Sequence, residues 1–411
     1  MSERFEVIVI GGGLAGACAA ALLARHAGID PARVALLAAQ LPAPAVDGAP
    51  PDLRVAALSR ASERVLGAAG AWQRLDTQRL CAYERMRVWH ESAAVDGAGS
   101  LCFDAADLGE PNLGHIAEMN ALQRACIESF RDSGGVVREA AVDALEFDQD
   151  AARLRSGADL FEARLVVGAD GGQSLVRESA GLPVRTRDYH QRAIVATVAT
   201  AKPHAHTAWQ RFLHTGPLAL LPLYDGCSSI VWSLDESAAR ANLECDTLEF
   251  EQRLSSACAY ALGEVRLASE RASFPLRSMA ADSYVAPRCA LIGDAAHVIH
   301  PLAGQGANLG LLDAAALCEA VAAAPSLRED AGALRLLRRY EQQRRTHNLT
   351  MDAAMQVFQK GFAAARGPAA WLVNQGFAMV DRSGPLKRAF ARQALGITGE
   401  LPPLARASFG Q

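Results

Sequence analysis

Three glycine-rich signatures, spread over most of the chain, constrain its fold more than any other feature. They are residues 11–16 (GGGLAG), 168–171 (GADG) and 293–297 (GDAAH). Each follows a short apolar run of the kind typical of a buried parallel strand. In this order they predict an α/β fold that holds one extended nucleotide cofactor along its whole length.

The first signature has the context of a dinucleotide site, because it lies between a predicted strand (6–10) and a predicted helix (15–26), with a second strand expected at 33–37. Gly11 permits the tight turn, Gly13 lets backbone approach a pyrophosphate, and Gly16 allows close packing of helix on strand. Leu14 and Ala15 open the helix, whose free N–H groups and dipole favour a phosphate. The alternative is an ordinary glycine-rich turn.

One expected element is missing from this site. An acidic residue normally ends the second strand and binds ribose hydroxyls. Here Ala38 or Ala39 occupies that place, and Gln40 follows as a neutral candidate. We therefore expect weaker retention of the adenosine ribose.

The second and third signatures each place a carboxylate directly after a buried strand. Asp170 and Gly171 also fit a simple turn, since Asp-Gly is a common turn dipeptide. Asp294, after Gly293, can accept hydrogen bonds from the ribitol hydroxyls of a flavin. Burying such a carboxylate is costly unless it has a partner.

Residues 300–310 (HPLAGQGANLG) form the richest segment. Gly304 and Gly306 let backbone approach a flat ring, and a helix is expected from about Ala307, with Asn308 in its first turn. Such a helix N-terminus stabilises an anionic reduced flavin. The alternative is a glycine-containing helix cap.

Three further polar residues leave their roles open. His297 and His300 could act as general bases, but the sequence favours packing and hydrogen bonding at the helix start. Arg54 could reach the flavin ring or a phosphate, or it could form a surface ion pair.

Composition narrows the class of protein. The 411 residues suggest two or three domains, and half are apolar, enough for a large core. A net charge of −4 gives no sign of the excess of basic residues that is typical of nucleic-acid-binding proteins. The nine cysteines form no C-x-x-C and are expected to be reduced thiols of a cytoplasmic protein, and no metal-ligand spacing appears. No signal peptide is evident at the N-terminus.

The pattern along the chain predicts three regions. Residues 60–75 and 121–133 look helical. Strand-like segments at 194–198 and 228–232 suggest an inserted sheet over the cofactor, with residues 86–90 as a further strand of that sheet. The pattern after residue 307 is mainly helical. We expect a discontinuous Rossmann-like FAD-binding domain (1–82, 110–184 and 275–325), a β-sheet substrate domain (83–109 and 185–274) and C-terminal helices (326–411).

From about residue 5 to about residue 395, the chain resembles the ubiquinone-biosynthesis hydroxylases, a family of class A FAD-dependent monooxygenases. Besides the three signatures, the matching segments are 52–54 (DLR), 57–59 (ALS), 86–89 (MRVW), 114–118 (GHIAE), 210–212 (QRF), 216–222 (GPLALLP), 230–232 (IVW) and 293–310. The departures are the alanines at 38 and 39, and Gly172-Gln173 where the family usually has Ala-Asn.

The resemblance implies an aromatic hydroxylase. NADPH or NADH would reduce FAD, O2 would form a flavin C4a-hydroperoxide, and one oxygen would pass to a polyprenylated phenol or quinol. Pro301, Gly304 and Gln305 would line flavin and substrate, with the Pro301 carbonyl facing the substrate hydroxyl. The alternatives are a class A monooxygenase acting on another aromatic or an alkene, and a non-catalytic flavin-binding partner of a biosynthetic complex.

A polyprenyl substrate also raises the question of membrane contact. Residues 369–379 are apolar on several sides, and Lys387, Arg388 and Arg392 follow. This combination could dock at the inner membrane or on another protein of quinone biosynthesis. The alternative is that Trp371, Leu372, Phe377 and Met379 pack on the FAD domain. Oligomerisation stays open.

Overall fold

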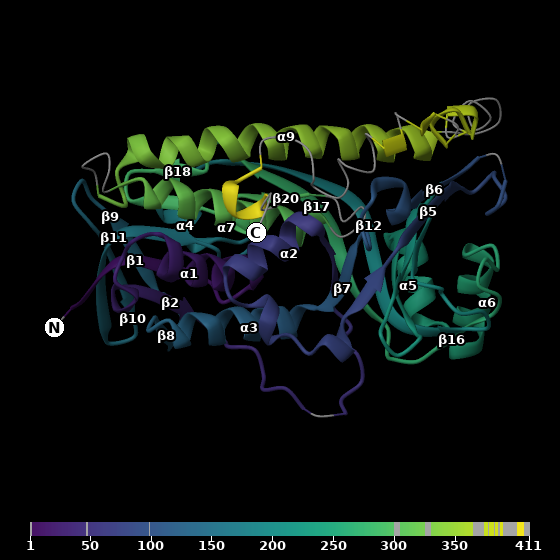
Figure 1. The fold of residues 1–411 in the computed structure, drawn as a ribbon, viewed down its shortest axis with the longest axis horizontal. Coiled ribbons are helices and arrows are strands. Elements are labelled where there is room, and N and C mark those ends of the chain that lie inside the picture. Colours follow the sequence, from purple (N-terminus) through teal and green to yellow (C-terminus); the bar gives the residue numbers. More distant parts are fainter. Residues whose placement is uncertain are drawn as a thin grey trace.

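The computed structural model describes residues 2–46, 48–97, 99–299, 305–324, 330–364, 374–376, 378–381, 383–384, 387–388 and 401–406. Two large sheets lie at opposite ends of the elongated molecule, with helices packed around the first (Figure 1). The helices are α1 (Leu14–His26), α2 (Arg60–Ala68), α3 (Met119–Asp132), α4 (Leu175–Ser179), α5 (Glu236–Glu244), α6 (Thr247–Ala257), α7 (Gln305–Ala322) and α9 (Leu334–Ala364).

The first sheet has eight strands and a parallel centre. Its main path runs β18 (Val285–Ala286), β19 (Cys289–Leu291), β11 (Asp159–Gly168), β1 (Glu3–Ile10), β2 (Val34–Ala38) and β8 (Val136–Glu139). Off this path, β10 (Ala152–Ser156) pairs with β11, and β9 (Ala144–Phe147) pairs with β10. The pairs from β19 to β8 are all parallel. Strands β1, β11 and β19 therefore end at one edge, and each leads into one of the three glycine signatures.

The second sheet has nine strands and is mainly antiparallel. Its path runs β20 (His297–Val298), β17 (Ala272–Ala281), β12 (Val184–Thr200), β15 (Ser228–Asp235), β14 (Gly216–Pro222), β13 (Thr207–Leu213), β5 (Arg85–His90) and β6 (Ser100–Asp104), with β16 (Val265–Leu267) beside β12. The expected joining of residues 86–90 to this sheet is confirmed, since β5 pairs with β13.

A small third sheet connects these two regions. It consists of β3 (Val55–Ser59), β7 (Gly114–Glu118) and β4 (Cys81–Tyr83). Ile116 and Cys81 of this sheet share an apolar cluster with Ala208 and Leu221 of the nine-stranded sheet. The predicted domain limit at residue 184 coincides with the first residue of β12, and the limit at residue 275 falls inside β17. Both limits remain predictions.

The expected helix over residues 60–75 is wrong in its second half. Helix α2 ends at Ala68, Gly70 takes a positive φ of +69°, and a single short turn follows at Trp72–Arg74. A left-handed glycine just beyond a helix is a common terminator, because it satisfies the last carbonyls without a steric penalty.

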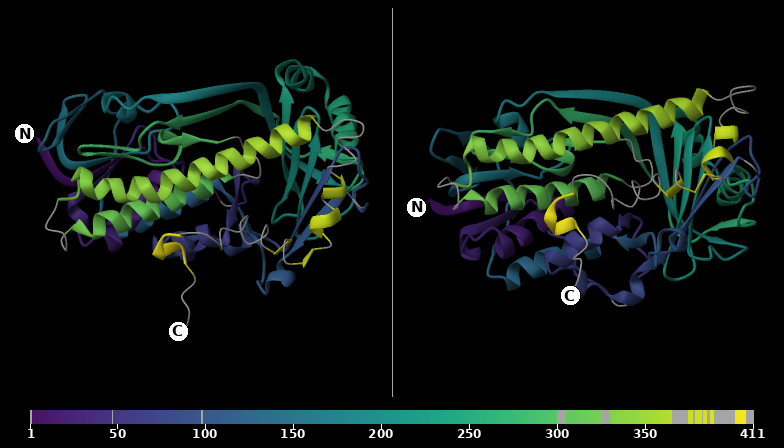
Figure 2. Two further views of the ribbon diagram at one scale, coloured as in Figure 1. Left: turned by 90° about the horizontal axis from the view of Figure 1, so that it is seen from above. Right: turned by 45° about the horizontal axis from the view of Figure 1, so that its top comes forward.

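Helix α9 packs on α7 and β18 and also contacts β13, so it runs along the first sheet and reaches the second (Figure 2). All nine cysteines are free thiols. Within the described part of the chain, no helix is long and apolar enough to cross a membrane, and no group of His, Cys, Asp and Glu could hold a metal ion.

Candidate cofactor and active site

The first and second glycine signatures touch each other. Gly11 has φ +115°, and a Cβ placed on it would lie 2.1 Å from the Ala169 carbonyl oxygen and 2.8 Å from the Asp170 nitrogen. The Ala169 N–H also donates to the Ile10 carbonyl at 2.8 Å. Only glycine fits at residue 11, because its neighbour is rigid backbone and its φ is positive.

The third signature meets the first through small side chains. A Cβ on Gly293 would lie 3.0 Å from the Ala15 Cβ, and one on Gly310 would lie 3.1 Å from the same atom. Helices α1 and α7 therefore pack closely, and neither carries an acidic residue in its first turn. Unpaired N–H groups and the positive end of the helix dipole make such N-termini suited to anions.

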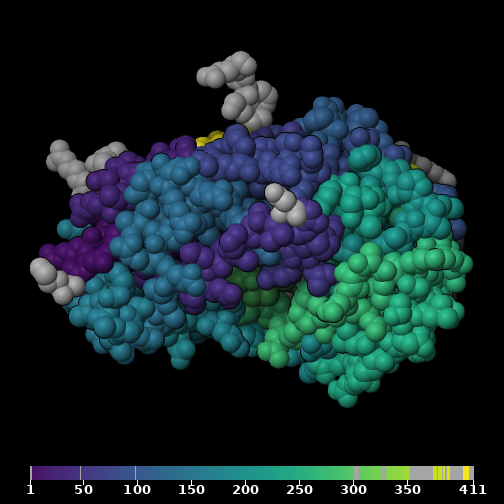
Figure 3. Space-filling model, turned by 90° about the horizontal axis from the view of Figure 1, so that it is seen from below, coloured from purple at the N-terminus to yellow at the C-terminus, as the bar shows by residue number. Residues whose placement is uncertain are grey.

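The residues around this meeting point fit the predicted FAD. Apart from the adjoining chain and helix backbone, no atom of the described residues lies within 4 Å of a Cβ placed on Gly13, Gly171 or Gly306, so a ligand could approach the backbone there. A Cβ on Gly16, by contrast, would lie 2.0 Å from the Gly11 carbonyl oxygen, which is the close packing expected of the third glycine. Seen from below, the molecule is hollowed near its middle, between N-terminal and green segments (Figure 3).

Asp294 has the properties of a ligand-facing carboxylate. Its side chain is exposed to solvent, yet the protein around it raises its pKa by desolvation, while His297 and Arg54 act in the opposite direction. A carboxylate that solvent reaches, although protein atoms surround much of it, lies in a concave part of the protein surface. The positive charge of Arg54 acts to lower this pKa, and its role toward the cofactor stays a prediction.

Asp170 and Asn308, two of the predicted cofactor-binding residues, form side-chain hydrogen bonds with other parts of the protein. Asp170 accepts hydrogen bonds from the Ser174 hydroxyl and from the Val176 N–H at 3.1 Å, which holds the start of α4. The Asn308 amide joins α7 to the third sheet: its Oδ1 accepts from the Ser59 N–H at 2.9 Å, and its Nδ2 donates to the Ala57 carbonyl at 2.9 Å. Because this side-chain amide is already hydrogen-bonded, Asn308 would contact a cofactor through its backbone.

A buried network centred on Asp313 was missed by sequence reasoning. Asp313 Oδ2 lies 2.6 Å from His297 Nε2 and accepts the Gly293 N–H at 3.1 Å. Its Oδ1 accepts from Arg344 Nε at 2.8 Å and from Asn348 Nδ2 at 3.2 Å. The network therefore fixes the backbone of the third signature. An aspartate inside the apolar run of α7 was the available signal, since such a group needs partners.

His297 is buried and hydrogen-bonded to Asp313, which agrees with the predicted role in packing rather than with a general base. Gln305, Gly306 and Ala307 form the half-buried first turn of α7, beside the signatures. His300, Pro301 and Gly304 lie outside the described residues, so the role of the Pro301 carbonyl stays a prediction.

Comparison with known proteins agrees with this site. Residues 4–353 match the family described as FAD binding domain. The chain is 34% identical to 3-demethoxyubiquinol 3-hydroxylase of Escherichia coli, over 96% of this chain and 100% of that protein. It is 37% identical to ubiquinone hydroxylase UbiL of Rhodospirillum rubrum, over 97% and 91%.

A solved structure, p-nitrophenol 4-monooxygenase PnpA from Pseudomonas putida, shares the fold with a TM-score of 0.76 at 20% identity, over 96% of this chain and 98% of that one. The converging glycine signatures and the full-length similarity lead to one conclusion. The chain belongs to the FAD-binding-domain family, as a class A flavoprotein monooxygenase.

Proposed function

We propose that this monooxygenase hydroxylates the aromatic ring of a polyprenylated phenol or quinol in ubiquinone biosynthesis. The observation that carries the proposal is the similarity to 3-demethoxyubiquinol 3-hydroxylase over the whole of that protein, with no segment of the relative left uncovered. The site supports it, because the same chain provides all three flavin signatures and a separate sheet beside them.

FAD, when bound, supplies the activation of O2 with electrons from NADPH or NADH. The chain's own residues would hold and orient it. The N-termini of α1 and α7 would bind its anionic parts, and Asp294 would accept hydrogen bonds from its sugar alcohol. The Asp313 network keeps Gly293 in place.

The nine-stranded sheet offers an apolar surface for the substrate. Val195, Ala219 and Val231 are register neighbours on β12, β14 and β15, and Gln210 of β13 continues the row. The alternate side chains, such as Ile230, pack with α5 and α6 on the opposite face. Ala219 and Val231 are only half-buried although their strands are central, whereas Val195 and Gln210 are buried, so this face is accessible at Ala219 and Val231.

The same face is turned toward the cofactor region. Ala208 and Leu221, one residue row away, pack on Ile116 of the third sheet. Asn308 bonds that sheet to α7. A small-residue, apolar surface there suits an aromatic ring with a prenyl chain, because burying apolar area is the main source of affinity for such a ligand.

The test uses purified protein loaded with FAD and supplied with NADPH or NADH, isotopically labelled O2 and a short-chain prenylated quinol. We expect a product that carries one labelled oxygen, with nicotinamide oxidation matched to product. The same ring without its prenyl chain is the control. Turnover of the unprenylated ring alone would favour a different aromatic substrate, and the lipids of a deletion strain would identify the ring position.

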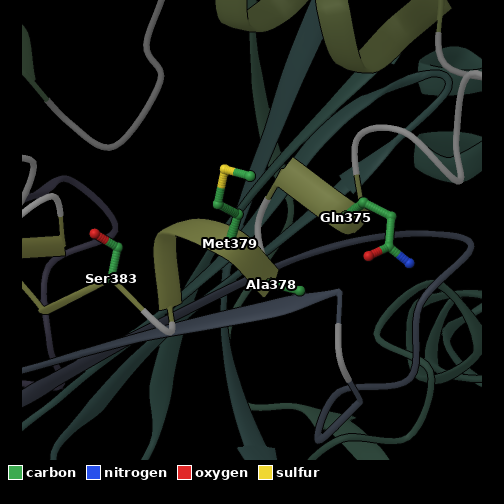
Figure 4. A pocket seen from close by; sticks show the side chains of 4 residues that line it. All are labelled: Gln375, Ala378, Met379 and Ser383. Carbon is green, nitrogen blue, oxygen red and sulfur yellow. The ribbon is translucent and has the colours of Figure 1, made fainter.

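We further propose peripheral contact with a membrane through the C-terminal segment. Met379 has an exposed fraction of 70%, so it does not pack on the FAD domain as the alternative interpretation expects, and Arg388 is also exposed. Ala378, in contrast, is buried, and the two side chains point to different sides of the turn (Figure 4). Trp371, Leu372, Phe377 and Arg392 lie outside the described residues.

A further inference from the structure

Glu139 lies beside the end of β2, where the acidic residue expected to bind ribose is missing. Ala38 ends β2, and its register partner on the adjacent parallel strand β8 is Glu139. The Ala140 N–H donates to the Ala38 carbonyl at 2.7 Å, which fixes this register. Register neighbours in a sheet direct their side chains to the same face, so Glu139 and Ala38 share one face.

That face lies under the first glycine signature. A Cβ placed on Gly12 would lie only 2.7 Å from the Ala38 Cβ, so the turn crosses directly over Ala38. Glu139 is exposed, and it makes no hydrogen bond or ion pair with any other residue that the structure describes. Its carboxylate is therefore available to a ligand at the carboxyl edge of the parallel sheet.

We propose that Glu139 binds the adenosine ribose hydroxyls of FAD, in place of an acid at residue 38. Adjacent strands are about 4.8 Å apart, a gap that the long glutamate side chain can cover while alanine leaves room for it. Gln40 is a weaker candidate, because a neutral amide forms weaker hydrogen bonds than a carboxylate. The inference rests on FAD as the cofactor and not on the identity of the substrate.

The test compares FAD with FMN, which contains the flavin ring and ribitol phosphate but no adenosine. Apoprotein is titrated with each by fluorescence. We expect Glu139→Gln to raise the Kd for FAD by about tenfold or more, as for loss of a charged hydrogen bond, and to leave the Kd for FMN unchanged. Ala38→Glu added to this variant should restore FAD affinity. Glu146→Gln, an exposed glutamate on β9, is the matched control.

Three results would overturn the inference: an unchanged FAD Kd in Glu139→Gln, an equal loss for FAD and FMN, or an FAD-specific loss produced by Gln40→Ala while Glu139→Gln has none. Failure of the substrate proposal would leave the flavin affinities intact, so the two failures are distinguishable.

Discussion

The Asp294 carboxylate is open to water, but the protein around it raises its pKa. This combination is common where a side chain faces a ligand. We predict that Asp294→Ala weakens FAD binding by roughly tenfold to a hundredfold, the usual effect of losing a charged hydrogen-bond acceptor. Asp294→Asn, which keeps one acceptor oxygen, should lose less. The measurement is an FAD titration of apoprotein.

The raised pKa also gives this affinity a pH dependence. As the pH falls, Asp294 becomes protonated sooner than an ordinary aspartate would, so FAD affinity should decline earlier on acidification. The Asp294→Asn variant should lack this part of the decline. Asp150→Ala, at an exposed loop position, serves as the control. Wild-type affinity in Asp294→Ala would refute the assignment.

Asp313 shows the opposite electrostatic balance. Burial acts to raise its pKa, but His297 and Arg344 outweigh burial and hold the pKa below its usual range. Asp313→Asn leaves the fully buried Arg344 without its carboxylate, so we predict a loss of about 3–5 kcal/mol in the free energy of unfolding, measured by urea denaturation.

The sign of the pH effect follows from the lowered pKa. The folded state favours the charged carboxylate, so Asp313 contributes stability above its unfolded-state pKa of about 4 and loses it as the pH falls further. The variant should therefore be less sensitive to acid than the wild type. Asp148→Asn, which removes an exposed ion pair with Arg153, should leave stability nearly unchanged. Equal stability of Asp313→Asn and wild type would contradict the prediction.

At the scale of elements, the nine-stranded sheet has two faces with different roles. One packs on α5 and α6, and the other carries the accessible row through Ala219. We predict that Ala219→Phe raises KM for the prenylated quinol by about tenfold, since filling a pocket with extra carbon atoms excludes ligand volume. FAD affinity should not change. Ala219→Gly, which keeps the space, is the control, and an unaltered KM in the phenylalanine variant would exclude this face.

The elements near the glycine signatures could be predicted from sequence, because short apolar runs and glycine turns are local signals. The structure confirms the strand before Gly11 and the strand that ends at Gly168. Longer-range features could not be predicted. Asn308 finds its partner Ser59 across 249 residues, and Glu139 adjoins Ala38 only after β8 pairs with β2. Such pairings depend on tertiary packing, which a local pattern does not encode.

For the whole molecule, the C-terminal segment is tied to the outer edge of the nine-stranded sheet. Asn374 donates to the Ser92 hydroxyl at 3.0 Å, and Lys387 lies 3.0 Å from Asp381 and 3.6 Å from Asp107. The charge of Lys387 is thus balanced by two carboxylates, and its reversal would disturb the fold. Met379 and Arg388 are the exposed described residues that could meet a lipid surface.

These positions define the test of membrane contact. An exposed methionine can enter the headgroup boundary, and an arginine is attracted to anionic lipid by about 1 kcal/mol near the surface. We predict that the protein floats with phosphatidylglycerol vesicles more than with phosphatidylcholine vesicles, and that Met379→Glu with Arg388→Glu reduces flotation and turnover of vesicle-borne substrate. Leu160→Glu, an exposed apolar position on β11 of the eight-stranded sheet, is the control. Turnover of a detergent-dispersed substrate should stay unchanged in both variants. Equal flotation of the double variant and wild type would rule out this segment as the contact, because the two substitutions together remove the apolar and basic side chains that its described part exposes.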